Sequence, residues 1–189
     1  MTHYQLVFNG PIHQVSGNAL RARIAQVLEL ANCESLTLVF SSEGGSTVEG
    51  ISLHNFIRAL PVPIRIHGAG SIASIAVPIF CAGHRRTCGE FSRFFFHAFE
   101  WNFPAGSQMT DRIAEASIIL DDDIRLSKDM VALRSKIPPV ELDKIYGRNP
   151  TPTIVSPAKA LEWGLVEEIV ELNPTGIAQP NVAVWTVGW

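Results

Sequence analysis

One serine, Ser74, stands where a predicted strand meets a predicted helix, and its surroundings fit a nucleophile. Residues 68–83 (GAGSIASIAVPIFCAG) follow an alternating apolar run typical of a strand and continue into small and aliphatic residues typical of a buried helix. The first N–H groups of a helix lack backbone acceptors and can bind an anion, so a hydroxyl beside them is a candidate nucleophile. Because serine at such a turn is also a common helix cap, Ser74 needs support from other stretches.

A glycine pair gives the first support. Residues 42–46 (SEGGS) end a nearly all-apolar strand at 36–40 and precede residues 48–60, whose apolar side chains recur at helical spacing. Paired glycines let the backbone turn tightly and bring an exposed amide close to a ligand. The alternative is a plain turn, which the pair alone favours. The pattern matches neither a phosphate loop nor a dinucleotide-binding motif.

His97 gives the second support, because it follows the apolar strand predicted over residues 93–96. Functional groups of parallel sheets gather at the carboxyl ends of the strands, which share one edge. The glycine pair, Ser74 and His97 all fall at such ends. Together they predict a serine–histidine centre with backbone amide donors.

The elements that must position these groups alternate between strands and helices. Strands are expected at residues 4–8, 36–40, 62–66, 85–88, 93–96 and 165–170, and helices after Ser16, over 48–60 and after Ser156-Pro157, where the serine is a cap. Short, wholly apolar strands are typical of a parallel sheet buried on both faces. We therefore expect an α/β fold, with residues 182–187 as an edge or partner-paired strand.

A long segment without glycine or proline, residues 108–136, predicts a helix of roughly eight turns. Such a helix is longer than a small domain covers, so it is expected to project and pack against another subunit. Asp121, Asp122 and Asp123 in its middle are interpreted as a solvated face, because three successive helix residues fan around the axis and make a poor metal site. A proline pair ends this helix, and a short helix follows at 140–146.

The composition limits the class of protein. A chain of 189 residues is expected to be a single domain, with its core at about 4–170 and a C-terminal tail at 171–189. Hydrophobic residues make up 47% and charged residues 17%, which indicates surface buried against further copies. A net charge of −3 without long charged blocks argues against nucleic acid and anionic membranes as partners.

The same survey predicts no cofactor and no metal. The three cysteines are odd in number and lack metal-type spacing, as expected for reduced thiols in a cytosolic protein. No apolar run is long enough for a membrane span, and no signal peptide precedes the first strand. We therefore expect a cytoplasmic location.

Four segments resemble the Clp protease family, whose proteolytic subunits are serine peptidases of the ClpP/crotonase superfamily. They come in the family's order and cover about residues 4–170. Residues 42–46 are similar to Ser-Pro-Gly-Gly-Ser, residues 70–74 with Ala82-Gly83 to Gly-x-Ala-Ala-Ser, residues 92–97 to Ser-Arg-x-x-x-His, and residues 156–166 to Ser-Ala-x-Glu-Ala-x-x-Tyr-Gly-Leu-Val. The resemblance implies a repeated β-β-α spiral core with a long projecting helix used for oligomerisation.

The resemblance also assigns roles to residues. It implies that Ser74 is the nucleophile, that His97 is the general base, and that the backbone amides of Gly45 and Ile75 form the oxyanion hole. Ser71 is a competing nucleophile, although counting back from Ala82-Gly83 favours Ser74.

The third member of the triad departs from the family. An ungapped alignment puts Pro152 where the family has aspartate, and Asn149 is the nearest side chain whose carbonyl can accept a hydrogen bond from the imidazole. We therefore predict Asn149 as the provisional orienter, with Asp143 as a less favoured substitute. Asparagine orients the ring without neutralising an imidazolium, so slower turnover is expected.

These features predict a serine endopeptidase that cleaves peptides or unfolded polypeptides inside a homo-oligomeric chamber, either heptameric or a double ring. The chain starts almost at the first strand and has Thr37 and Val39 where the family has docking tyrosines, which argues against docking of a Clp-type ATPase. One alternative is an inactive or weakened ring component, because the aspartate is absent and residues 98–102 are altered. Another is a crotonase-type acyl-CoA enzyme, which Ser74 with His97 fits poorly.

Overall fold

In the computed structural model, which describes residues 2–29, 33–100, 109–147, 149–171 and 182–186, helices and strands alternate along the chain. The strands are β1 (Thr2–Asn9), β2 (Cys33–Ser42), β3 (Ile64–Ala73), β4 (Arg85–Cys88), β5 (Arg93–Phe96), β6 (Thr153–Val155), β7 (Glu168–Ile169) and β8 (Val182–Thr186). The helices are α1 (Gln14–Leu28), α2 (Thr47–Arg58), α3 (Ala76–Cys81), α4 (Thr110–Ala132), α5 (Pro139–Tyr146) and α6 (Pro157–Glu162). The predicted α/β class is confirmed.

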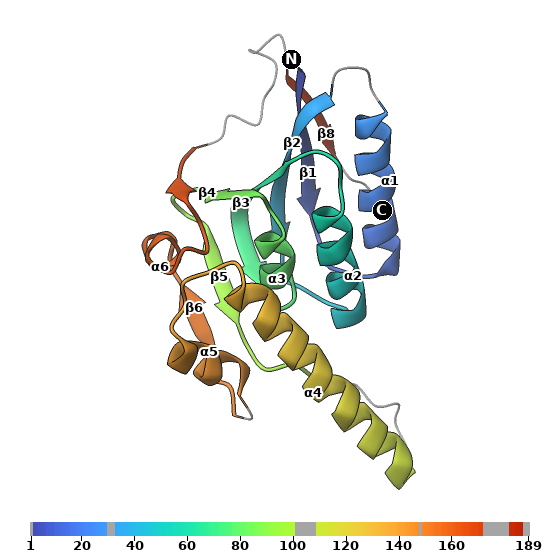
Figure 1. Cartoon of the computed structure of the whole chain (residues 1–189), viewed down its shortest axis with the longest axis vertical. Helices are drawn as coiled ribbons and strands as arrows, with labels where there is room; N and C mark the ends of the chain where they lie inside the picture. Colours follow the sequence, from blue (N-terminus) through green and yellow to red (C-terminus); the bar gives the residue numbers. More distant parts are fainter. Residues whose placement is uncertain (1, 30–32, 101–108, 148, 172–181, 187–189) are drawn as a thin grey trace.

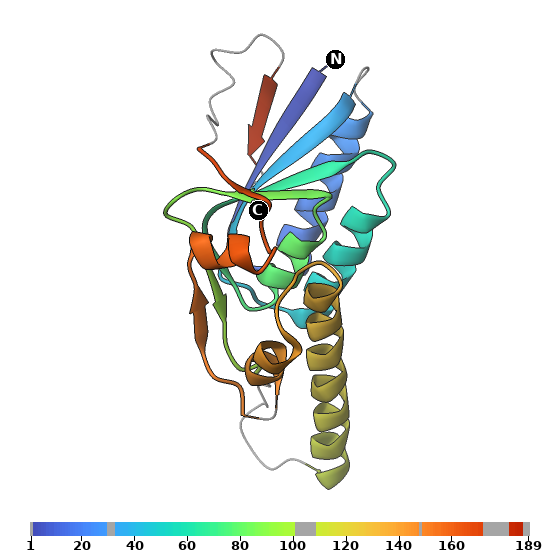
Figure 2. The same ribbon diagram turned by 60° about the vertical axis from the view of Figure 1, so that its left-hand side comes forward.

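The strands form one largely parallel sheet in the order β6-β5-β3-β2-β1-β8, with β4 beside β3 and β7 beside β4. Among the strand pairs of the described residues, only β5 with β6 is antiparallel. β8 pairs with β1 at the edge, as the edge-strand prediction requires. Helices α1, α2 and α3 lie along one face of the sheet, and α4 extends beyond its lower end (Figures 1 and 2).

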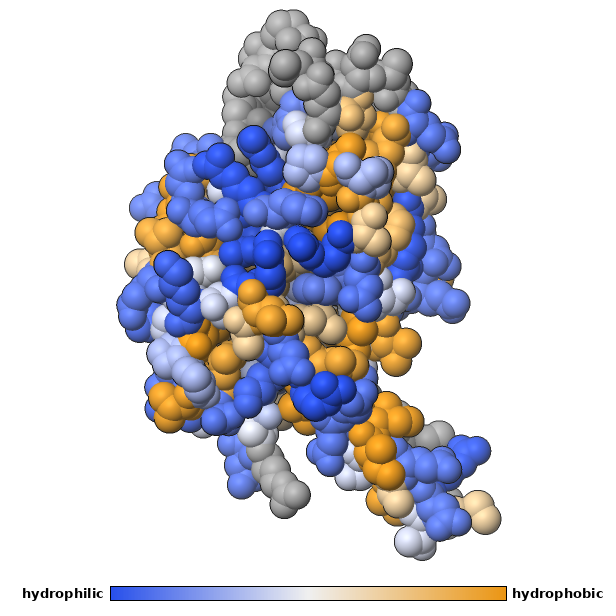
Figure 3. Space-filling view, viewed as in Figure 1, coloured by the Kyte–Doolittle hydropathy of each residue, from blue (hydrophilic) through white to orange (hydrophobic). Residues whose placement is uncertain are grey.

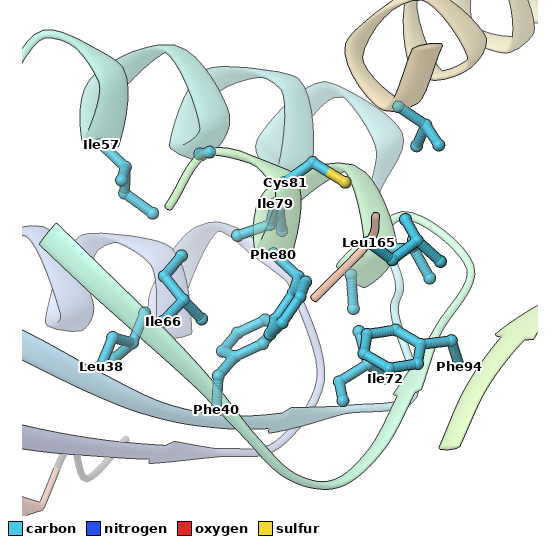
Figure 4. Close-up of a cluster of buried hydrophobic side chains, with 14 of the residues drawn as sticks. Leu38, Phe40, Ile57, Ile66, Ile72, Ile79, Phe80, Cys81, Phe94 and Leu165 are labelled. Carbon is cyan, nitrogen blue, oxygen red and sulfur yellow. The ribbon is translucent and has the colours of Figure 1, made fainter. Parts of the chain in front are cut away.

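The core lies between the sheet and these helices (Figure 4). Leu38 and Phe40 of β2 are fully buried, and so is Phe80 of α3. The Phe80 ring meets the Phe94 ring edge to face, with 5.0 Å between centroids. Fully burying one such side chain stabilises the fold by about 1.5–3 kcal/mol, so this cluster fixes α3 against β3 and β5.

Strand β3 is longer than predicted, because it changes partner along its length. Its first part, Arg65 to Gly68, pairs with β4, and its last part, Ser71 to Ala73, pairs with β5. The sequence pattern ended this strand at residue 66, since it could not show that a second strand would continue the pairing. Ser74 therefore follows directly on the last residue of a strand.

The start of α1 corrects a prediction. The N-cap is His13 and not Ser16: His13 Nδ1 accepts a hydrogen bond from the Ser16 N–H at 3.1 Å, and Ser16 Oγ accepts one from the His13 N–H at 3.1 Å. The two residues thus satisfy each other's donors in a capping box. The predicted cap at Ser156 of α6 is confirmed.

Two elements are shorter than predicted, because part of each predicted backbone bonds elsewhere. Helix α4 ends at Ala132, and the Lys136 N–H donates to the Trp163 carbonyl at 2.6 Å. Residues 165–170 were predicted as a strand, yet the N–H groups of Leu165 and Val166 donate to Ala160, so only Glu168–Ile169 is extended. The predicted start of α4, residue 108, lies outside the described residues.

The acidic triplet of α4 also differs from its interpretation as a solvated face. Asp121 and Asp122 are exposed, but Asp123 is only 7% exposed and accepts a hydrogen bond from the Thr47 hydroxyl at the start of α2. Asp123 therefore ties the projecting helix to the body of the domain.

Candidate active site

Ser74 occupies the turn between β3 and α3 in a left-handed backbone conformation. Its φ is 56°, and no other residue with a side chain has a positive φ in the described part of the chain. A residue with a Cβ is disfavoured in this region by about 1–2 kcal/mol. Such strain persists only where the surrounding structure enforces it, and it is typical of nucleophiles at sharp strand-to-helix turns.

Hydrogen bonds hold this turn in place. The Ser74 N–H donates to the Phe95 carbonyl at 2.8 Å, and the Ser74 carbonyl accepts from the Val77 N–H at 3.0 Å. Ala73 pairs with Phe95 in the sheet, so β5 runs beside the turn and leads to His97 two residues later. The structure thus brings Ser74 and His97 to one edge of the sheet.

His97 is partly buried, and 5.3 Å separate the centroids of its ring and the Phe95 ring. Its Nδ1 lies 2.8 Å from the carbonyl oxygen of Ala98. Since a carbonyl only accepts, Nδ1 carries the proton of this bond, which leaves the lone pair on Nε2. Nε2 is the nitrogen that a general base uses. Among the described residues no hydrogen bond joins His97 to Ser74.

The glycine pair lies against Ser74. A Cβ on Gly44 would stand 2.8 Å from the Ser74 Cβ and 3.4 Å from its Oγ. Ile12 fixes the next residue, because its N–H donates to the Gly44 carbonyl and its carbonyl accepts from the Ser46 N–H, both at 2.8 Å. These bonds use the groups on either side of Gly45. The N–H of Gly45 itself has no acceptor in the described part of the chain.

The second predicted amide belongs to Ile75, whose side chain is fully buried. Gly50 of α2 packs on it so closely that an added Cβ would stand 2.2 Å from the Ile75 Cγ1. This packing fixes the backbone that follows Ser74. No described residue accepts a hydrogen bond from the Ile75 N–H, so this donor, like that of Gly45, is available to a ligand.

The remaining candidates lie apart from this arrangement. Asn149 is exposed and makes no hydrogen bond within the described ranges, and the Asp143 carboxylate pairs with Lys128. Ser71 lies inside β3, where its Oγ accepts from the Arg93 guanidinium at 3.3 Å. Among these three, none is joined to His97 by a hydrogen bond.

Two features of this site have no signal in side-chain chemistry. The partner of His97 is the carbonyl of Ala98, and the anchor of Ser74 is the carbonyl of Phe95. Every residue carries a carbonyl, so residue types and spacing could not single these out.

A hollow of about 190 Å³ opens beside His97. Its walls include Ala98 and Phe99 from the segment after the histidine, Leu120 and Ile124 from α4, and Tyr146 from α5. These walls are mainly apolar, and Asp121 adds one carboxylate. The hollow can take an apolar side chain beside the segment that follows His97.

The cysteines do not compete with Ser74 as nucleophiles. Cys81 and Cys88 are buried and unpaired, and burial raises their pKa values to about 12 and about 11. Both thiols therefore stay protonated at neutral pH. The part of the chain described here contains no group of three or more metal-binding side chains, and none of its helices is long and apolar enough to cross a membrane.

Comparison with known proteins identifies the family of the chain. A family model described as Clp protease matches residues 2–173. The chain belongs to the Clp protease family. The resemblance carried by the four sequence segments is thereby confirmed.

Named relatives of the family are similar along most of their length. The ATP-dependent Clp protease proteolytic subunit 3 of Rhizobium johnstonii is 28% identical over 166 residues, which cover 85% of this chain and 80% of that protein. The ATP-dependent Clp protease proteolytic subunit 2 of Thermobifida fusca is 25% identical over 179 residues, which cover 90% of this chain and 82% of that protein. The ATP-dependent Clp protease proteolytic subunit 1 of Mycobacterium leprae is 24% identical over 171 residues, which cover 88% of this chain and 82% of that protein.

Proposed function

We propose that this protein is a serine peptidase of the Clp type, with Ser74 as nucleophile and His97 as general base. The observation that carries the proposal is the left-handed backbone of Ser74, bonded to the strand that leads to His97. Family membership supports peptidase chemistry in general.

The catalytic cycle would use few groups. His97 Nε2 takes the hydroxyl proton as Ser74 Oγ attacks the peptide carbonyl, and it returns this proton to the leaving amine. The N–H groups of Gly45 and Ile75 stabilise the oxyanion, and neither has another acceptor among the described residues. Water then hydrolyses the acyl-enzyme by the same proton route.

Two groups are candidates for orienting the His97 ring. Asn149 is the residue that the sequence predicts, and the Ala98 carbonyl is the group that Nδ1 bonds. A carbonyl selects the tautomer needed for a base but adds no full negative charge to stabilise the imidazolium. Either candidate implies slower turnover than an aspartate would give.

The proposed substrates are peptides or unfolded polypeptides. An extended chain can place its carbonyl at Ser74 only if its neighbouring side chain finds room, and the apolar hollow beside His97 offers that room. An aliphatic or aromatic side chain next to the cleaved bond fits these walls best.

We further propose that copies of the chain assemble into a heptameric ring or a double ring through α4. Three isoleucines of this helix, Ile113, Ile118 and Ile119, are 50%, 69% and 44% exposed. Figure 3 shows apolar surface on the projecting helix α4. Burying such surface between copies is favourable. The absence of the docking tyrosines at Thr37 and Val39 argues against a Clp-type ATPase as partner.

A ring component without hydrolytic activity is the second candidate. It is favoured by the lack of a hydrogen bond between Ser74 and His97 in the described structure, and by the absence of the family's aspartate. In that case the same assembly would have a structural role.

A fluorophosphonate probe distinguishes the two. We expect covalent labelling of the assembled wild type, loss of labelling and of peptide hydrolysis in Ser74→Ala, and retention of both in the matched control Ser71→Ala. An intact assembly that neither labels nor cleaves unstructured casein would favour the inactive ring component. Labelling that survives Ser74→Ala and disappears in Ser71→Ala would move the nucleophile to Ser71.

A further inference from the structure

A second hollow, of about 600 Å³, lies where the end of α4 meets the end of α6. Residues 133–136 form one wall, Leu161, Gly164, Val166 and Glu167 form another, and Arg86 of β4 also lines the hollow. The catalytic groups proposed above do not take part in it. Its lining contains three cations, Arg86, Arg134 and Lys136, against one carboxylate, Glu167.

Backbone and packing contacts hold the two walls together. The Lys136 N–H donates to the Trp163 carbonyl at 2.6 Å. The aliphatic stem of Lys136 passes over Gly164, where an added Cβ would stand 3.3 Å from the Lys136 Cγ. The path of the lysine side chain is therefore fixed by the end of α6, while the side chain as a whole is exposed.

Arg86 has a structural role in this place. Its Nε donates to the Leu165 carbonyl at 2.8 Å and its Nη2 pairs with the Glu167 carboxylate at 3.0 Å. Its side chain is only 7% exposed. The single carboxylate of the hollow is thus already engaged by the buried arginine.

Arg134 and Lys136 are different, because neither pairs with a carboxylate among the described residues. Arg134 donates through Nη2 to the Gly83 carbonyl at 3.0 Å, but its Nε is buried without an acceptor. A buried donor left without a partner is costly. The other N–H groups of this guanidinium have no carboxylate partner among the described residues, so a ligand oxygen in the hollow can bond them.

The electrostatics of the neighbourhood agree with excess positive charge. Burial lowers the pKa of the nearby His84, and Arg58 and Arg134 lower it further. An anion entering the hollow would meet this field together with the hydroxyl of Ser135.

The hollow also has an apolar component. Leu133 is 83% exposed and Leu161 is 44% exposed, and both line it. Large apolar side chains left open beside unpaired cations fit a ligand that carries an apolar group next to an acidic one. A free inorganic anion would leave both leucines in water.

We propose that this hollow is a binding site for an acidic peptide segment, in which one carboxylate is flanked by leucine-like side chains. The carboxylate bonds the Arg134 guanidinium and the Lys136 ammonium, and the flanking side chains cover Leu133 and Leu161. A partner polypeptide supplies both kinds of group in one segment, and its negative charge is complementary to the two cations of the hollow.

Calorimetric titration of the full-length protein tests the proposal. The probe is acetyl-Ser-Leu-Glu-Leu-Ser-amide, and the neutral control replaces its glutamate with glutamine. We expect the neutral peptide to bind at least about tenfold more weakly, because glutamine cannot form the charge-assisted hydrogen bonds that a carboxylate forms. Repeating the titration with Ser74→Ala shows whether cleavage of the probe contributes to the heat.

Variants locate the binding. Arg134→Gln and Lys136→Gln should each lower the affinity for the acidic peptide by about five- to tenfold, because each removes one partner of the peptide carboxylate. Arg125→Gln and Lys144→Gln remove the same charges at exposed, paired positions elsewhere and should change affinity less than about twofold. Lys136→Gln is the key variant, since an exposed side chain can be changed without affecting folding.

Three results would overturn the proposal. The first is no binding of the acidic peptide at about 1 mM, a concentration at which even weak recognition is measurable. The second is equal binding by the pocket variants and the two control variants. The third is binding of inorganic phosphate that depends on Arg134 and Lys136 while the peptide does not bind, which would make the hollow a simple anion site.

Discussion

The Ser74 N–H donates a hydrogen bond to the carbonyl of Phe95, with 2.8 Å between nitrogen and oxygen. This bond joins the turn after β3 to β5, and His97 follows only two residues after Phe95. Two groups that are far apart in sequence are therefore located relative to each other by the main chain of the sheet. The relationship does not depend on side-chain identity, because both bonding groups belong to the main chain.

Backbone strain at Ser74 predicts an unusual order of stabilities. Ser74→Gly and Ser74→Ala both remove the hydroxyl, but only glycine adopts a φ of 56° without a Cβ penalty. We expect Ser74→Gly to be more stable than Ser74→Ala by about 1 kcal/mol in urea unfolding. Equal stabilities, or a more stable alanine variant, would mean that the turn is not strained in solution.

Gly45 should tolerate no side chain. Its φ is 145°, and an added Cβ would stand 2.2 Å from the carbonyl oxygen of Ile12. We expect Gly45→Ala to lower the free energy of unfolding by at least about 2 kcal/mol. The matched control is Gly89→Ala, whose Cβ would meet nothing closer than 3.5 Å and should cost less than about 1 kcal/mol. Similar losses in both variants would contradict the backbone argument.

The Asp123 carboxylate and the Thr47 hydroxyl should be energetically coupled. Asp123 is buried and accepts the hydrogen bond that joins α4 to α2, so Asp123→Ala should destabilise the fold by about 2 kcal/mol. The exposed neighbour Asp121 gives the control, Asp121→Ala, with little expected change. A double-mutant cycle with Thr47→Val measures the coupling, and additive effects of the two substitutions would exclude it.

His67 should make stability fall in mild acid. Its side chain is 4% exposed, and burial lowers its pKa from 6.5 to about 4. As the pH falls, His67 is protonated in the unfolded chain before it is protonated in the folded chain. The stabilisation that the neutral, buried His67 contributes is therefore complete above pH 6.5 and is lost as the pH falls from 6.5 towards 4.

Urea unfolding of wild type and His67→Gln at pH 7 and pH 5 measures this contribution. We expect the wild type to lose about 1–2 kcal/mol more than the variant between these pH values. The same pH dependence in both proteins would show that His67 stays neutral or is solvated in the folded state.

The partner of His97 can be assigned by kinetics. Because Nδ1 already bonds the Ala98 carbonyl, we expect Asn149→Ala to keep kcat within about twofold of wild type. A fall of about tenfold or more in kcat at unchanged KM would instead assign the orienting role to Asn149. Glu162→Ala, which breaks only the exposed pair with Lys159, is the control.

Much of the local structure could be predicted from the sequence, because its signals are local. Alternation and apolar runs predicted the strands at 85–88 and 93–96 with the observed bounds, and Ser156 with Pro157 predicted the start of α6. The start of α1 differed through the local capping box of His13 and Ser16, whereas β3 and α4 differed through distant partners. The extension of β3 depends on β5, and the end of α4 depends on the Trp163 carbonyl.

The sequence by itself determined the α/β class, the family and the candidate residues Ser74, His97, Gly45 and Ile75, because residue types and their order are enough for these. Only the tertiary structure decided the left-handed turn at Ser74, the bond from His97 to the Ala98 carbonyl and the burial of Asp123. The physical reason is that backbone conformation, carbonyl partners and burial are set by what packs alongside, which a single chain read in order does not contain.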